Sequence, residues 1–192
     1  MTEHDELADA LNPVLQVFAE LGITYRIGGS VASSVYGRAR STMDVDLVVD
    51  LAPSHVRPLC DALHHAYYLD EQAVREAIGN RGAFNLIHLA TMIKVDLFVL
   101  DQGPFDRASF QRCRSESIGT LKNVAFCTAE DMVLRKLEWY RAGGQISERQ
   151  WSDVLGLLQV QADTLDREYL VRWARELDLL TLLERAEKEA QA

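Results

Sequence analysis

Two aspartates stand at positions i and i+2 where a strand is expected to begin. Asp44 and Asp46 open the apolar run 45–51, which predicts a strand largely covered on both faces. Because side chains alternate along a strand, the two carboxylates project from one face and repel each other. A cation between them relieves that repulsion, as does protonation of one, and Mg²⁺ prefers such oxygen ligands. The pair predicts a metal site; the alternative is that Asp44 caps a turn and Asp46 is a strand-edge charge.

A third carboxylate, Asp96, interrupts another strand-like run, 94–100. If the two strands are neighbours, Asp44, Asp46 and Asp96 converge on one point. Three carboxylates can hold two divalent ions about 3.5–4 Å apart, an arrangement that activates an attacking oxygen and stabilises a leaving phosphate. The alternative for Asp96 is again a charge at a strand edge.

A glycine turn precedes the acids. Gly28, Gly29 and Ser30 lie between a short predicted strand, 23–27, and a predicted helix, 31–36. Glycines allow the backbone to approach a phosphate closely, and a helix N-terminus offers free N–H groups and a favourable dipole. The turn therefore predicts a phosphate site, in which the Ser30 hydroxyl binds phosphate, caps the helix, or does both.

The ordered set from Gly28 to Asp46, together with the later Asp96, resembles the signature of the nucleotidyltransferase (polymerase-β-like) superfamily. The resemblance covers roughly residues 23–100. It implies an α+β nucleotidyltransferase fold, with a small mixed β-sheet flanked by helices and a C-terminal helical region. It also implies two Mg²⁺ ions, or Mn²⁺, on Asp44, Asp46 and Asp96, and an NTP at the glycine turn.

The second half of the chain resembles the minimal stand-alone nucleotidyltransferase-like proteins of bacteria, including AbiEii-type toxins. These proteins place a lysine on one helix and an arginine beside an aspartate on the next. Here Lys136 and Asp153 match this pattern, whereas Arg149 departs from it because it lies four residues before Asp153. The resemblance implies that Lys136 neutralises triphosphate charge and that Asp153 belongs to the nucleotide site.

Lys136 can also be interpreted from its own helix. It lies within an apolar stripe, so it reaches a buried anion or extends outward to solvent. Asp153 pairs with Lys136 and orients it, or belongs to a solvated helix face. Arg40, just before Asp44, could steer a triphosphate or a nucleic-acid acceptor to the site; the alternative is a surface arginine on a loop.

Periodicity outlines the elements that hold these residues. It predicts a nucleotidyltransferase α/β core over 1–104 and a C-terminal helical region over 105–192 that packs on the core. Capping boxes predict helix starts at Thr128 and Ser147. The remaining predicted helices cover 7–21, 54–66 and 169–186, the remaining strands 84–89 and 94–100 as a hairpin, and a short β-segment falls within 117–126.

Composition bounds the class of protein. The 192 residues carry a net charge of -9, which disfavours a general nucleic-acid binder but leaves room for a local basic patch. Three cysteines without a CxxC spacing argue against a disulfide framework or a zinc site, so a reducing cytoplasm is expected. We expect neither a signal peptide nor a membrane span.

These observations favour a Mg²⁺-dependent transfer of a nucleoside monophosphate from an NTP to an acceptor hydroxyl, with Asp44, Asp46, Asp96 and Lys136 as catalytic residues. The acceptor is RNA such as tRNA, a protein or a small molecule. One interpretation is the toxin of a toxin–antitoxin pair, with a partner protein encoded by an adjacent gene. The alternatives are a non-catalytic nucleotide- or partner-binding module, antitoxin-like or regulatory, and an antibiotic nucleotidyltransferase.

Overall fold

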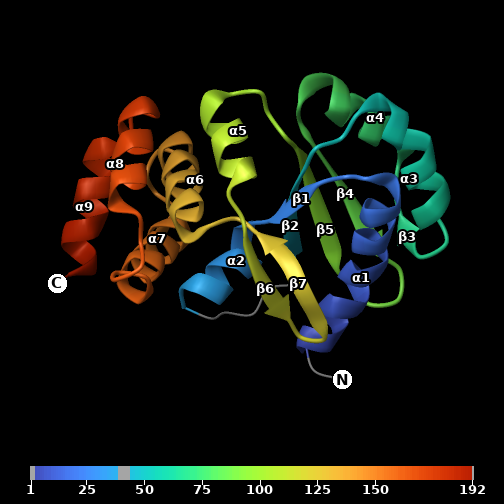
Figure 1. The fold of residues 1–192 in the computed structure, drawn as a ribbon, viewed down its shortest axis with the longest axis horizontal. Coiled ribbons are helices and arrows are strands. Elements are labelled where there is room, and N and C mark those ends of the chain that lie inside the picture. The colour runs from blue at the N-terminus through green and yellow to red at the C-terminus, as the bar shows by residue number, and fades with distance from the viewer. Residues whose placement is uncertain (1–2, 39–43, 192) are drawn as a thin grey trace. The chain divides into compact units, whose positions relative to one another are not determined.

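The computed structural model describes residues 3–38 and 44–191 (Figure 1). Its described residues divide into two compact units. Unit 1 comprises residues 3–31 and 44–126, and unit 2 comprises residues 32–38 and 127–191. The predicted division between residues 104 and 105 falls inside unit 1, because the chain there continues into a helix and a hairpin of the same unit.

Unit 1 is built around a mixed seven-stranded sheet of order β3-β4-β5-β2-β1-β7-β6. β2 pairs with β5 in parallel and β1 with β7 in parallel, while the other neighbouring strands are antiparallel. The predicted fold class, α+β with a mixed sheet and helices, is confirmed. The strands are β1 (Tyr25–Ile27), β2 (Asp44–Val49), β3 (Tyr67–Tyr68), β4 (Ala83–His88), β5 (Lys94–Val99), β6 (Arg114–Ile118) and β7 (Leu121–Phe126).

Burial alternates along the central strands. On β2, Val45, Leu47 and Val49 are fully buried, whereas Asp44 is exposed and Asp46 is half-buried. β5 alternates in the same way and in register with β2. The face that carries Asp44, Asp46 and Val48 is thus less covered than the opposite face, a difference that a nearly all-apolar run does not reveal.

The buried face of the sheet packs against helices of unit 1, which are α1 (Glu3–Leu21), α3 (Val56–Leu63) and α4 (Glu71–Asn80). Tyr67 on β3 links them, because its hydroxyl donates to the carbonyl of Ala10 at 2.7 Å within the core. α1 has its buried residues at the predicted helical spacing and ends before Gly22, whose φ of 69° suits a helix C-terminus.

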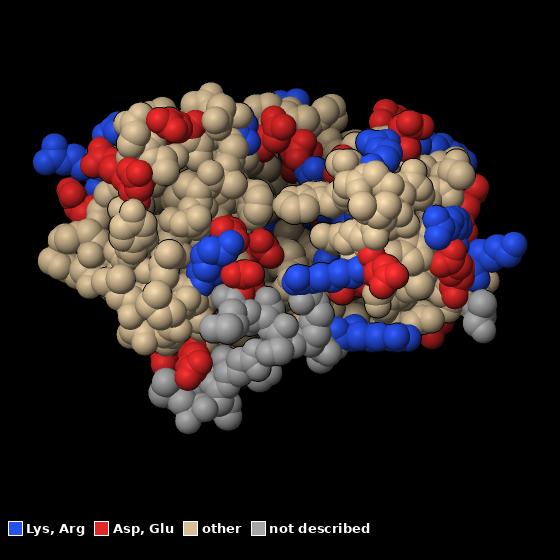
Figure 2. All heavy atoms as spheres, turned by 180° about the vertical axis from the view of Figure 1, so that it is seen from behind, with Lys and Arg blue, Asp and Glu red and all other residues tan. Residues whose placement is uncertain are grey.

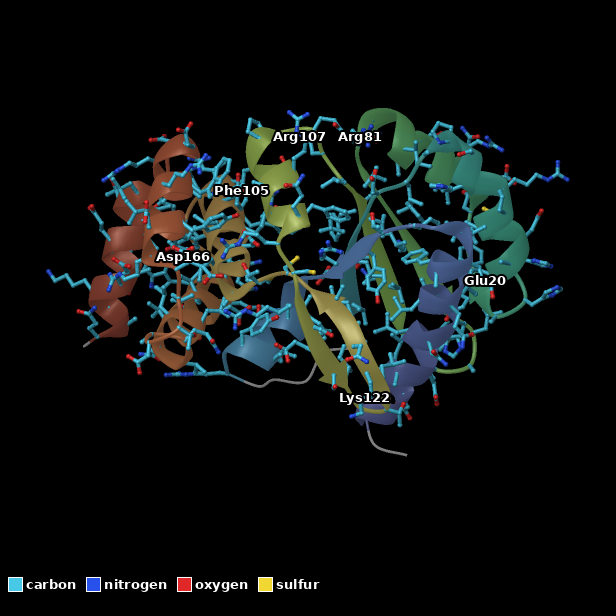
Figure 3. The ribbon with its side chains drawn as sticks, viewed as in Figure 1. Glu20, Arg81, Phe105, Arg107, Lys122 and Asp166 are labelled. Carbon is cyan, nitrogen blue, oxygen red and sulfur yellow. The ribbon has the colours of Figure 1, made fainter. Side chains whose placement is uncertain are left out.

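Periodicity missed two helices of unit 1. α4 starts at the N-cap Asp70 and ends at Arg81, which adopts a left-handed φ of 54° (Figure 3). The glycine-containing segment 79–82 is thus the end of this helix. The other missed helix is α5 (Pro104–Gln111), a short helix with few buried residues.

Unit 2 is helical and holds the C-terminal part of α2 (Gly29–Tyr36), which begins in unit 1 at the glycine turn. Thr128 and Ser147 cap their helices as predicted, through hydrogen bonds from Asp131 N and Gln150 N. The predicted helix 169–186 is two helices, because the chain reverses at Asp178 with φ 57° although the apolar stripe continues. The helices are α6 (Ala129–Ala142), α7 (Glu148–Val160), α8 (Arg167–Glu176) and α9 (Leu180–Ala190).

Charged side chains of both signs are interspersed over the face of the molecule shown in Figure 2. None of the helices within the described residues is both long and apolar enough to span a membrane.

Candidate active site

The parallel pairing of β2 with β5 brings the three predicted acids together. In this register Asp46 lies opposite Asp96, and Asp44 lies opposite Lys94. Because neighbouring strands lie about 4.8 Å apart and i, i+2 residues share a face, the three carboxylates form one cluster on the less covered face of the sheet. This is the arrangement that the sequence made conditional on the two strands being neighbours.

The glycine turn packs directly on the second of these acids. Gly28 N donates to the backbone oxygen of Asp46 at 2.9 Å, and Ser30 N donates to Asp46 Oδ2 at a long 3.4 Å. Gly29 has φ 56°, and a Cβ added there would lie 1.6 Å from Asp46 Oδ2. The turn therefore requires glycine at position 29 for two reasons, its backbone conformation and the space taken by the Asp46 carboxylate.

This contact also has an electrostatic consequence. Gly29 and Ser30 form the first residues of α2, where backbone N–H groups point out of the helix end. A carboxylate placed there is stabilised by the N–H groups and by the helix dipole. The same donors suit phosphate oxygens, so the turn links the acid cluster to a potential anion site.

Lys94 lies among the acids, and sequence analysis had not singled it out. Its Nζ is 2.7 Å from Asp96 Oδ2 and 3.9 Å from Asp44 Oδ1. The hydrogen bond to Asp96, with the charges of the surrounding aspartates, raises the pKa of Lys94. A lysine two residues before a strand aspartate shares its face, and this spacing was the signal available in the sequence.

Two more polar residues share this face of the sheet and were also missed. Asn85 on β4 lies opposite Asp96 and is exposed. Arg26 on β1 lies opposite Val48, and its guanidinium stacks over the ring of Phe110 on α5, 4.7 Å from the centroid. Arg26 Nε is buried and has no hydrogen-bond partner among the described residues.

Lys136 and Asp153 belong to unit 2 and form a buried ion pair. Lys136 Nζ is 2.7 Å from Asp153 Oδ2, and the two side chains are only 8% and 12% exposed. Gln150 Oε1 is a second, longer acceptor at 3.4 Å. Of the alternatives drawn from the sequence, the structure shows Lys136 reaching a buried anion and Asp153 pairing with it, and it excludes the solvated helix face for Asp153.

The acidic start of α6 is part of the scaffold of unit 2. Asp131 accepts hydrogen bonds from Thr128 Oγ1 at 2.8 Å and from the Tyr169 hydroxyl at 2.7 Å. Glu130 Oε1 accepts from Asp166 N at 2.9 Å. These buried carboxylates join α6 to α8 and hold the helix that carries Lys136. Arg40, the remaining predicted nucleotide-binding residue, lies outside the described residues.

The donor set of the cluster fits a hard divalent cation, because Asp44, Asp46 and Asp96 supply only carboxylate oxygens. In the part of the chain that the structure describes, no three acidic, histidine or cysteine side chains are already arranged to hold a metal ion. Lys94 Nζ lies among the cluster's oxygens instead. Binding of a metal ion therefore requires side-chain rearrangement at Lys94 and its neighbours.

Several solved structures share the fold of this chain. The antibiotic-resistance factor ANT(2'')-Ia in solution is 12% identical, covers 96% of this chain and 94% of its own, and has a TM-score of 0.56. An antigenic nucleotidyltransferase-like protein from Paracoccidioides brasiliensis is 19% identical, with coverage of 96% and 93% and a TM-score of 0.54. The lincosamide antibiotic adenylyltransferase LnuA with lincomycin bound is 14% identical, with coverage of 78% and 95% and a TM-score of 0.50.

The chain thus has the nucleotidyltransferase fold. No protein-family model matches the chain, and neither does any curated protein. At these identities the likeness establishes the fold, and the activity must be argued from the residues of the site.

Proposed function

We propose that this protein is a Mg²⁺-dependent nucleotidyltransferase that moves a nucleoside monophosphate from an NTP to an acceptor hydroxyl. The observation that carries the proposal is the cluster of Asp44, Asp46 and Asp96 on one sheet face, with the Gly29 turn packed on Asp46. Carboxylates for a divalent cation and backbone donors for phosphate thus occur at one place, on a fold that nucleotidyltransferases share.

In this proposal each acid has its own role. Asp44 and Asp46 would hold both ions, and Asp96 would hold one of them and help to deprotonate the acceptor hydroxyl. When bound, two divalent ions polarise the phosphate and lower the pKa of the attacking hydroxyl. The acceptor oxygen forms a bond to the α-phosphorus, the bond from that phosphorus to the bridging oxygen breaks, pyrophosphate leaves, and the hydroxyl proton passes to a carboxylate such as Asp96.

Backbone N–H groups of the glycine turn complete the nucleotide site in this proposal. Gly29 and Ser30 at the N-terminus of α2, with Gly28 allowing the close backbone approach before them, bind the terminal phosphates in this proposal. The family resemblance implies that Lys136 neutralises triphosphate charge; within unit 2 its ammonium group lies 2.7 Å from Asp153 Oδ2. Such chemistry depends on positioning and electrostatics more than on covalent steps by the protein.

For the acceptor, we propose a small cationic molecule in preference to tRNA. The chain carries a net charge of -9, which repels a polyanion and attracts a cation. Two of the structures with this fold are described as an antibiotic-resistance factor and an antibiotic adenylyltransferase. A toxin that modifies RNA remains the competing proposal for the same chemistry.

The activity test uses NTPs labelled at the α-phosphate. Purified protein with Mg²⁺ is given each NTP with total RNA, total protein, or a panel of basic small molecules, and the labelled fraction is identified. We expect Asp46→Asn to abolish transfer with little effect on folding, and Asp50→Asn, an exposed aspartate just beyond β2, to transfer normally. Full transfer by Asp46→Asn would refute the proposed site.

The acceptor class is separated by the destination of the label and by growth. Label in a basic small molecule supports our acceptor proposal, whereas label in RNA together with growth arrest on expression of the protein alone supports the toxin. Wild-type protein that binds NTP in calorimetry, with and without Mg²⁺, but never transfers label would favour the nucleotide-binding module. The ammonium of Lys94 among the acids is the observation on which that second candidate rests.

A further inference from the structure

We propose that Lys94 is the resident counterion of the acid cluster, and that binding of a divalent cation displaces its ammonium group. The inference rests on the proposed metal site and adds a residue to it. The evidence is positional: Nζ lies 2.7 Å from Asp96 Oδ2 and 3.9 Å from Asp44 Oδ1.

The strand register places Lys94 beside these acids. Lys94 lies directly opposite Asp44 on the parallel neighbour, and two residues before Asp96 on its own strand. All three side chains therefore project from one face, together with Asp46. Without a cation three carboxylates would repel one another at this spacing, and the ammonium group offsets one of the negative charges.

The exposure of these groups shows how the ammonium can be displaced. The Lys94 side chain is 40% exposed, and those of Asp44 and Asp96 are 56% and 20% exposed. An ion pair this accessible to water is weak. A lysine has a flexible four-carbon stem, so Nζ can turn to solvent when a doubly charged ion takes the same carboxylate oxygens.

A different behaviour is expected of the other short lysine–aspartate pair. Lys136 and Asp153 are 8% and 12% exposed, and their pair lies within the helical unit. Such a buried pair has no comparable path for its ammonium to solvent. Lys94 is therefore the lysine whose environment should respond to a divalent ion at the cluster.

The first test measures lysine accessibility in the wild-type protein. The chain has four lysines, at positions 94, 122, 136 and 188. Brief acetylation with and without Mn²⁺, read out by mass spectrometry, should show Lys94 becoming several-fold more reactive with metal. Lys122, at the turn end of the β6–β7 hairpin (Figure 3), and Lys188 are exposed and serve as unchanged references. Unchanged or lower Lys94 reactivity at saturating Mn²⁺ would overturn the inference.

The second test compares metal affinity between variants by Mn²⁺ titration followed by electron paramagnetic resonance. Lys94→Met removes a competing charge that lies 2.7 Å from Asp96 Oδ2 and 3.9 Å from Asp44 Oδ1. The variant should therefore bind Mn²⁺ more tightly than the wild type, on the order of tenfold. Lys122→Met removes the same charge from an exposed site on β7 and should bind Mn²⁺ as the wild type does. Equal affinity of Lys94→Met and wild type would overturn the inference.

The two proposals fail in different ways. Suppose that Asp46→Asn and Asp96→Asn lose Mn²⁺ binding, whereas Lys94→Met binds Mn²⁺ as the wild type does. This result would support the metal site and refute the role of Lys94. If Lys94→Met binds Mn²⁺ more tightly but the wild type transfers no label from any NTP, the role of Lys94 as counterion is supported and the transferase activity is refuted. If neither the wild type nor Lys94→Met binds Mn²⁺, both the proposed metal site and the role of Lys94 are refuted.

Discussion

Replacing Gly29 by alanine tests the contact between the glycine turn and Asp46. Two independent costs are expected. An alanine held at φ 56° is strained by about 1 kcal/mol because its Cβ crowds the backbone. The Cβ would also lie 1.6 Å from Asp46 Oδ2 and 2.7 Å from Asp46 Cβ, so the carboxylate or the turn must move. Overpacking of this kind costs about 1–3 kcal/mol more.

Gly22 provides a matched control in the same unit. It has a similar left-handed φ of 69°, but a Cβ there would meet nothing within 4 Å. Gly22→Ala therefore carries only the backbone strain, about 1 kcal/mol. The difference in the free energy of unfolding between the two variants measures the overlap with Asp46.

Activity separates the variants further. A displacement of about 1 Å at a reacting site can lower the rate about 100-fold, so we expect Gly29→Ala to lose at least that much transfer while Gly22→Ala keeps wild-type transfer. The assays are chemical denaturation and transfer of labelled α-phosphate, at equal folded fractions. Transfer by Gly29→Ala within about threefold of Gly22→Ala would refute the role of this turn in positioning Asp46.

Two further predictions concern buried polar groups. Lys136→Met leaves the 12%-exposed Asp153 without its ammonium partner and should cost about 3–5 kcal/mol in unfolding free energy, while Lys136→Met with Asp153→Leu should recover most of it. A double variant that still transfers label would rule out Lys136 as a catalytic residue. Burial raises the pKa of Tyr67 above 10.0, so its contribution to stability is complete below pH 10 and lost above it as the unfolded state ionises. In Tyr67→Phe the denaturation midpoint should fall less steeply as the pH rises above 10. An equally steep fall in the variant and the wild type would contradict this.

Features set by neighbouring residues followed from the sequence. The shared face of Asp44 and Asp46 follows from the two-residue period of a strand, and the caps at Thr128 and Ser147 follow from side-chain oxygens three residues before a free N–H. The turn at Gly28 and Gly29 was also readable, because it lies between a strand and a helix. In each case the interacting groups lie within a few residues, so local geometry decides.

Features set by residues far apart in the chain needed the tertiary structure. Parallel pairing over some 50 residues decides that Asp96 meets Asp46 and that Lys94 meets Asp44. The periodicity of a strand does not specify which strand it pairs with, because the buried valines of β2 or β5 could pack beside several other strands. The 1.6 Å limit at Gly29 is likewise a contact across 17 positions, and it explains why glycine, rather than any small residue, must precede Ser30.

The same distinction applies to Lys136. Its place in an apolar stripe was visible in the sequence. This left two alternatives, in which the side chain contacts a buried anion or extends outward to solvent. Only the packing of α6 on α7 brings Asp153 to 2.7 Å and decides between them. The sequence by itself thus determined which residues can do chemistry and on which faces of their own elements they lie. The fold decided which charges meet, because the free energy of a charge depends on its neighbours in space.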